Sequence, residues 1–126
     1  MSRNEETYEQ ALDRVLASDT RYSREAYMFI QAALDYYQRQ HRQGRVREHV
    51  SGPELLKGIR ELALIEYGPM ARSVLNHWGL LRGEDVGEIV YNLIGVGLMA
   101  KTPEDRREDF DGVMAFDETM DQETSW

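Results

Sequence analysis

The chain reads VSGPELLKGIRELALIEYGPMARSVLNHWGLLRGEDVGEIVYNLIGVG over residues 50–97, and this segment contains three consecutive helical patterns. The first pattern begins at a capping box, in which the Ser51 hydroxyl and the Glu54 side chain can each bond the other residue's backbone amide. Apolar residues then recur at helical spacing as far as Gly68. Gly68 can take the left-handed conformation that ends a helix, and Pro69 cannot continue it but can open the next one.

The second and third patterns are separated by a short link with a glycine at each end. The second covers residues 69–78 and stops at Gly79. The third follows Gly83, with Glu84 and Asp85 in its first turn, where the helix dipole favours anions. Its apolar stripe consists of Val86, Ile89, Val90, Leu93 and Ile94, and Gly95 and Gly97 end it.

Two further helices are predicted in the N-terminal part of the chain. One covers residues 4–17, and the other is capped by Ser23 and ends near His41. A basic loop follows, so residues 1–49 are interpreted as two helices and this loop. The basic stretch over residues 38–47, which includes the end of the second helix, carries the first candidate interaction residues: Arg39, Arg42, Arg45 and Arg47.

The pattern changes after Gly97. Residues 98–102 and 110–116 can each be extended, and they enclose a highly charged segment, which predicts a β-hairpin. Residues 117–126 form an acidic tail that ends in Trp126. Three helices followed by a hairpin are the order of a winged-helix domain. We therefore predict a single, mainly α domain of five helices with a C-terminal β-hairpin, in which residues 50–116 form a winged-helix-like core. The alternative is a plain helical bundle.

Composition limits the classes of function. The 126 residues suit one domain, and zero cysteines exclude disulfides, thiolate metal sites and cysteine nucleophiles. The net charge of −8 arises wholly in residues 51–126, which hold seven basic and fifteen acidic side chains. Such a surface repels a phosphate backbone. The sequence has no apolar leader and no run that could span a bilayer, so we expect a cytoplasmic protein that has no contact with a membrane.

Three segments carry a resemblance to a known family: HVSGPELL (residues 49–56), YGPMA (67–71) and EDVGEIVYNLI (84–94). With them, about residues 26–116 resemble an uncharacterised family of small bacterial proteins, mostly of planctomycete and verrucomicrobial type. Val86 and Tyr91 depart from it, because such sequences often have phenylalanine there, but both remain apolar. The resemblance implies no activity, cofactor, partner or catalytic residue for this chain, and it implies that the chain is not a member of a well-known enzyme class.

The ionisable residues do not form a recognisable catalytic or metal-binding motif. His49 and His77 could bind a metal only together with distant carboxylates such as Glu54 or Glu88, because no two histidines have ligand spacing. Asp85 and Glu88 lie one helical turn apart, but the helix dipole already accounts for acidic residues at a helix start. We therefore assign no catalytic, cofactor-binding or metal-binding residue and expect no cofactor.

The leading hypothesis is a non-enzymatic, cytoplasmic module that binds another protein, with the four arginines named above and Trp126 as candidate contact residues. A winged-helix-type nucleic-acid-binding protein is the alternative. It is disfavoured because residues 83–100 contain no Lys or Arg, and because Glu84, Asp85 and Glu88 would face the DNA groove. A metal-dependent enzyme is the third hypothesis.

Overall fold

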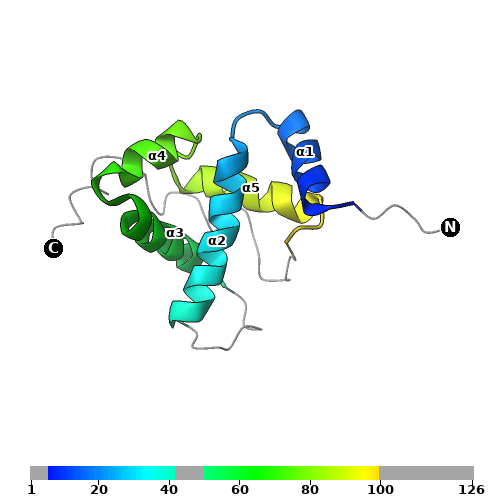
Figure 1. The fold of residues 1–126 in the computed structure, drawn as a ribbon. Helices are drawn as coiled ribbons and strands as arrows, with labels where there is room; N and C mark the ends of the chain where they lie inside the picture. The colour runs from blue at the N-terminus through cyan, green and yellow to red at the C-terminus, as the bar shows by residue number, and fades with distance from the viewer. Residues whose placement is uncertain (1–5, 42–49, 100–126) are drawn as a thin grey trace.

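The computed structural model describes residues 6–41 and 50–99, and these ranges are mainly helical, as the sequence predicts (Figure 1). No β-strand occurs within them. In chain order the elements are α1 (Tyr8–Ser18), α2 (Arg24–His41), α3 (Gly52–Tyr67), the 3₁₀ helix η1 (Gly68–Met70), α4 (Ala71–His77) and α5 (Gly83–Gly95). None of the described helices combines the length and the apolar character needed to cross a membrane.

Side-chain caps set where the helices begin. The predicted capping box of α3 is confirmed: the Glu54 amide donates to Ser51 Oγ at 3.2 Å, and the Ser51 amide donates to Glu54 Oε1 at 3.0 Å. Helix α1 begins at Tyr8, later than predicted, because Thr7 and Gln10 form a second capping box. Each box satisfies amides that the first turn of a helix leaves unbonded.

Helix α2 lies at the centre of the described structure. It packs against α3 on one side and against α1 on the other, and α5 also contacts it (Figure 1). Its buried residues are Ala26, Tyr27, Phe29, Ile30, Ala33 and Tyr37. Five of these six residues belong to the buried apolar core, so α2 contributes to the core together with the helices of residues 50–97.

The crossing of α2 and α3 is close because α3 has a glycine at the contact. A β-carbon built on Gly58 would lie 3.0 Å from Tyr37 Cβ and 3.1 Å from the Ala33 carbonyl oxygen. Such contacts are tighter than side chains normally tolerate, so a larger residue would force the two helices apart. Gly58 therefore sets the separation of α2 and α3.

Helix α1 runs antiparallel to α2. Arg24, at the start of α2, pairs with Glu9 and Asp13 of α1, while the Tyr8 hydroxyl donates to Gln31 Oε1 further along α2 at 2.7 Å. The start of α2 thus lies beside Glu9 and Asp13, and a later part of α2 lies beside the start of α1. The two helices form a helical hairpin that is closed by residues 19–23.

The corner between α3 and α4 is built on Gly68, whose φ is +52°, and on an aromatic cluster. The ring centroids of Phe29 and Trp78 are 5.5 Å apart, and Tyr67 meets Trp78 edge-on at 5.8 Å. Trp78 is partly buried and packs against the core. These rings join α2 to the C-terminal ends of α3 and α4.

The predicted hairpin lies mostly outside the described residues. Leu98 and Met99, the two described residues of its first strand, form a bend and pack against the core as partly buried side chains. The described ranges therefore support the mainly helical class and contain no strand of a winged helix. The basic segment 42–49 and the acidic tail 117–126 also lie outside the described residues.

Candidate functional site

The turn between α1 and α2 (residues 19–23) is held against the link between α4 and α5 (residues 78–82). The Ser23 amide donates to the Trp78 carbonyl oxygen at 3.2 Å. Gly79 has a φ of +100°, and a β-carbon built on it would lie 2.4 Å from the Arg21 carbonyl oxygen. Only glycine satisfies both this backbone conformation and this close approach. Two connections that are distant in the sequence are thus in direct backbone contact.

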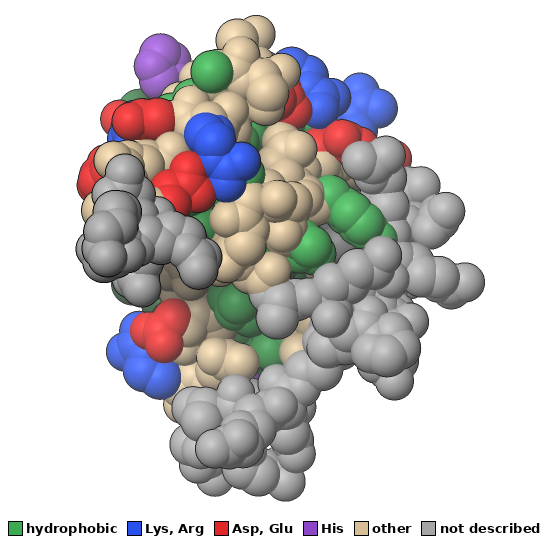
Figure 2. Space-filling view, turned by 90° about the vertical axis from the view of Figure 1, so that its right-hand side faces the viewer, with side chains coloured by type: hydrophobic (Ala, Val, Ile, Leu, Met, Phe, Trp, Pro, Cys, Tyr) green, Lys and Arg blue, Asp and Glu red, His purple; other side chains and the backbone are tan. Residues whose placement is uncertain are grey.

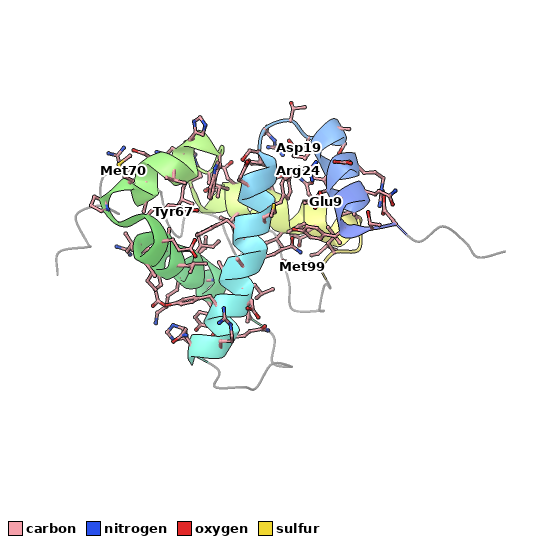
Figure 3. All side chains as sticks on the ribbon, in the orientation of Figure 1. Glu9, Asp19, Arg24, Tyr67, Met70 and Met99 are labelled. Atoms are coloured by element: carbon pink, nitrogen blue, oxygen red, sulfur yellow. The ribbon has the colours of Figure 1, made fainter. Side chains whose placement is uncertain are left out.

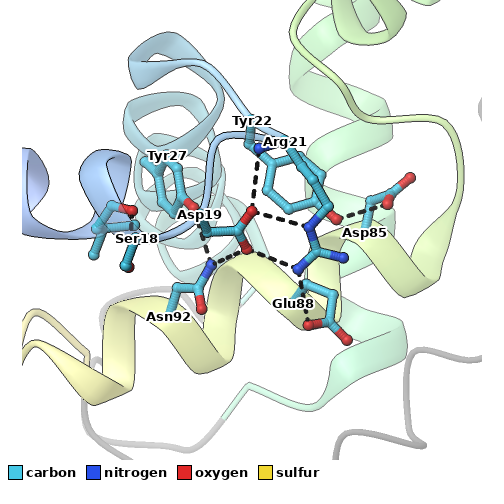
Figure 4. A network of polar contacts seen from close by, with 9 residues as sticks. Ser18, Asp19, Arg21, Tyr22, Tyr27, Asp85, Glu88 and Asn92 are labelled. Atoms are coloured by element: carbon cyan, nitrogen blue, oxygen red, sulfur yellow. Dashed lines mark hydrogen bonds and ion pairs between the residues drawn. The ribbon is translucent and has the colours of Figure 1, made fainter.

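Asp19, the residue that ends α1, binds Arg21 across the turn (Figure 4). Asp19 Oδ1 accepts hydrogen bonds from the Arg21 amide at 3.1 Å and from Arg21 Nε at 2.9 Å, and Oδ2 accepts one from Arg21 Nη2 at 2.7 Å. The same Nη2 lies 3.3 Å from Glu88 Oε1 on α5. A forked arginine–carboxylate pair fixes geometry more strongly than a single bond does.

Asn92 of α5 connects this ion pair to the core. Its Nδ2 donates to Asp19 Oδ2 and to the Tyr27 hydroxyl, both at 3.0 Å. Tyr27 is fully buried on α2. The Asn92 side-chain amide therefore joins α5 to the end of α1 and to the first turn of α2.

Tyr22 and Asp85 make the second connection to α5. The Tyr22 hydroxyl donates to Asp85 Oδ1 at 2.7 Å, while Asp85 Oδ2 accepts from the amides of Leu81 and Arg82 at 2.9 and 3.2 Å. Asp85 thus caps the start of α5 and anchors the turn at the same time. We use the name polar network for the whole set: Asp19, Arg21, Tyr22, Tyr27, Asp85, Glu88 and Asn92.

The network moves the pKa values of Asp19, Arg21, Tyr22 and Tyr27 away from neutrality. Hydrogen bonds from Arg21 hold the pKa of the Asp19 carboxyl well below its usual range, and the same bonds raise the pKa of Arg21. Burial, followed by the hydrogen bond to Asp85, raises the pKa of Tyr22. Burial also raises the pKa of Tyr27. At neutral pH the aspartate and arginine are therefore charged and both tyrosines are neutral.

These protonation states suit a structural role better than acid–base catalysis. A general acid or base works best when its pKa lies near the working pH, and each resolved shift in the network goes the other way. Within residues 6–41 and 50–99, no three His, Asp or Glu side chains are placed to hold a metal ion. The arrangement of the network holds the α1–α2 turn against α5.

A second, smaller polar cluster joins the end of α2 to α3. His41 Nε2 lies 2.9 Å from Glu61 Oε1, and the Tyr36 hydroxyl donates to the same oxygen at 3.3 Å. The His41 ring stacks on Tyr37, with centroids 4.4 Å apart. The polar groups of this cluster, like those of the polar network, are paired with one another and join α2 to α3.

The candidate interaction residues are not brought together within the described structure. Arg39 is exposed, and its Nε donates to Asp35 Oδ2 one turn earlier at 3.0 Å. His77 is exposed at the end of α4. The remaining candidates lie outside the described residues: Arg42, Arg45, Arg47, His49 and Trp126.

Two acidic residues of α5 are engaged within the chain. Asp85 and Glu88 do not project into a free groove, because Tyr22 and Arg21 of the α1–α2 turn bind them. The α1–α2 turn therefore covers the part of α5 that carries Asp85 and Glu88.

Sequence reasoning missed Asp19, Arg21 and Asn92 as members of a site. The only local signal was an acidic and a basic residue two positions apart in a short turn. Nothing local links Asn92 to Asp19, which is 73 positions away. Comparisons of the chain with protein-family models, with curated proteins and with solved structures each give no match.

Proposed function

We propose that this protein is a non-enzymatic, cytoplasmic module that binds another protein. The observation that carries the proposal is that the polar network is paired internally: Arg21 and Asn92 both donate to Asp19. The shifted pKa values leave these groups unsuited to proton transfer at neutral pH. The absence of cysteine suits the reducing environment of the cytoplasm.

Exposed apolar side chains also support the proposal. Ile65, Met70 and Leu81 are 66%, 59% and 52% exposed, at the end of α3, the start of α4 and the α4–α5 link. Figure 3 shows Met70 at the corner of α3 and α4, on the side of the molecule away from α1. These apolar side chains are accessible for contact with a partner protein.

Affinity capture with a matched pair of baits tests the proposal. The intact chain is compared with Ile59→Asp, which places a charge at a fully buried position and unfolds the bait. We expect the intact bait, and not the unfolded one, to retain a single protein in near-stoichiometric amount from cells that naturally produce the chain. Repeated failure of the folded bait to retain any protein would contradict the proposal.

We also propose that residues 50–116 form a winged-helix-like core, with the plain helical bundle as the alternative. The order α3, α4, α5 and the glycine-bounded link before α5 support it. Slow amide exchange in residues 98–102 and 110–116 with fast exchange between them is expected for a hairpin. Fast exchange throughout residues 98–116 would contradict the hairpin and support the plain helical bundle.

Nucleic-acid binding is the weaker hypothesis for the same fold. Its would-be recognition helix, α5, has two of its acidic residues and Asn92 engaged by the α1–α2 turn. A mobility shift with duplex DNA at low ionic strength, abolished by neutralising Arg39, Arg42, Arg45 and Arg47, would favour it over the protein-binding proposal.

A further inference from the structure

Helix α1 covers one face of α2. Arg24, Tyr27 and Gln31 are spaced i, i+3 and i+7, so they share one face of α2. Both outer members of this row bind α1, through the pairs of Arg24 with Glu9 and Asp13 and through the bond from Tyr8 to Gln31. Tyr27, between them, is fully buried. Helix α1 therefore lies across Tyr27.

The attachment of α1 is small. Only three of its eleven residues are buried, namely Ala11, Leu12 and Val15. Its ion pairs to Arg24 are open to solvent, since the Glu9 and Asp13 side chains are 73% and 61% exposed, and exposed pairs stabilise weakly. Figure 2 views this side of the molecule, where some acidic and basic side chains lie next to one another and hydrophobic side chains are also visible between them and the grey atoms.

The surface beneath α1 belongs to the apolar core, to which α1 itself adds Leu12 and Val15. Tyr27 sits on α2, which packs along its other face on α3 through Gly58, and Asn92 of α5 holds the Tyr27 hydroxyl. If α1 moves away, the apolar face of α2 and the Arg24 guanidinium are presented together. The residues of α1 that bind this surface show which kind of helix fits it.

We propose that α1 is a displaceable cover, and that the face of α2 beneath it is the site where the partner protein docks an amphipathic helix. The partner helix has the chemistry of α1: apolar residues at positions i, i+1 and i+4, with carboxylates at i−2 and i+2 that bind Arg24. This inference rests on the proposed function and identifies the surface where the partner protein binds. The intramolecular α1 competes for the surface, so the partner binds in proportion to the fraction of chains in which α1 is open.

A peptide with the sequence ETYEQALDRVLAS, residues 6–18, is the direct probe. It is labelled with fluorescein and titrated against the full chain, with binding read by fluorescence anisotropy. In the Leu12→Glu chain the intramolecular helix cannot dock, so we expect the peptide to bind at least about tenfold more tightly than to the unaltered chain. A peptide carrying the same Leu12→Glu change should not bind either chain.

A second variant opens α1 without touching the core. The doubly altered chain with Glu9→Gln and Asp13→Asn removes only the partners of Arg24 and leaves the surface of α2 intact. We expect this chain to bind the unaltered peptide several-fold more tightly than the unaltered chain does. The advantage should shrink in high salt, because the peptide's own carboxylates bind Arg24 through screened ion pairs.

Three results would overturn the inference. The first is a peptide affinity that is the same for the two opened chains as for the unaltered chain. The second is a Leu12→Glu peptide that binds as tightly as the unaltered peptide. The third is loss of cooperative unfolding in the Leu12→Glu chain, which would make α1 integral to the core. The proposed function fails separately. A captured partner that the peptide cannot compete away would overturn only the docking surface, whereas peptide binding without any captured partner would overturn only the proposed function.

Discussion

Asp19 is the residue on which the polar network depends most. It accepts hydrogen bonds from Arg21 and from Asn92, and it lies where α1 ends. Arg21 is more than half exposed, so solvent weakens the ion pair, while the bond from Asn92 lies in a half-buried setting. The carboxylate therefore contributes mainly by holding the α1–α2 turn in one geometry.

Asp19→Asn should lower the free energy of unfolding at pH 7 by about 1–2 kcal/mol, the usual range for a hydrogen-bonded carboxylate. Asp35→Asn is the matched control, since Asp35 is exposed and forms only a surface pair with Arg39, and it should cost less than half as much. Chemical denaturation of the three proteins measures the difference. Equal losses in the two variants would show that the network adds nothing to an ordinary surface pair.

The pH dependence of the Asp19 contribution has a definite sign. The folded state holds the pKa of this carboxyl below its ordinary value of 3.8, so its stabilisation is fully present above that pH. The contribution is lost as the pH falls from there through the folded pKa. The stability gap between the unaltered chain and Asp19→Asn should therefore stay constant from pH 7 to about pH 5 and narrow in stronger acid. A gap that widens on acidification would mean that Asp19 is protonated in the fold.

Ser51 tests the start of α3 in the same way. Ser51→Ala removes the acceptor for the Glu54 amide and should destabilise the protein by about 1 kcal/mol. Ser73→Ala, on the exposed surface of α4, is the control and should be close to neutral. An unchanged melting temperature for Ser51→Ala would mean that water replaces the cap at no cost.

At the scale of elements, two glycines in helices have opposite roles. Gly58 lies where α3 crosses α2, whereas Gly95 ends α5 with nothing near its missing β-carbon. Gly58→Ala should destabilise the fold by about 1–3 kcal/mol, because the new methyl group meets Tyr37 Cβ and a backbone oxygen. Gly95→Ala should be neutral or stabilise by up to about 1 kcal/mol through helix propensity. Thermal unfolding of both variants decides this, and a stabilising Gly58→Ala would show that the two helices can move apart freely.

The sequence predicted individual elements well because their signals are local. The Ser51–Glu54 box, the stop at Gly68 and the ends of α2 and α5 depend on residues within one helical turn. The packing was predicted poorly for the opposite reason. The central place of α2 depends on Gly58 meeting Tyr37, and the network depends on Asn92 meeting Asp19. Neither contact leaves a periodic pattern in the chain.

The orientation of α5 illustrates the same limit. Its acidic first turn was correctly predicted from Glu84 and Asp85, and the helix dipole was a sufficient reason for it. The pattern could not indicate that Asp85 also binds Tyr22, because that partner belongs to a turn more than sixty positions earlier. A residue with a local explanation can thus have a second, tertiary role.

For the whole molecule, we propose a core that stays folded while one helix, α1, opens. Helices α2, α3 and α5 share the buried apolar cluster, while α1 contributes few buried side chains and exposed ion pairs. Elements with few buried contacts open with less free energy than the whole domain requires. The proposed binding function depends on this difference, because a partner helix needs the surface that α1 covers.

Residue-resolved amide hydrogen exchange of the unaltered full chain tests this division most directly. We predict that amides of Leu12 and Val15 exchange at least about tenfold faster than those of Ile30 and Ile59, through an opening that leaves α2 and α3 protected. Exchange of α1 at the same rate as α2 and α3, with all of them opening only by global unfolding, would contradict the account.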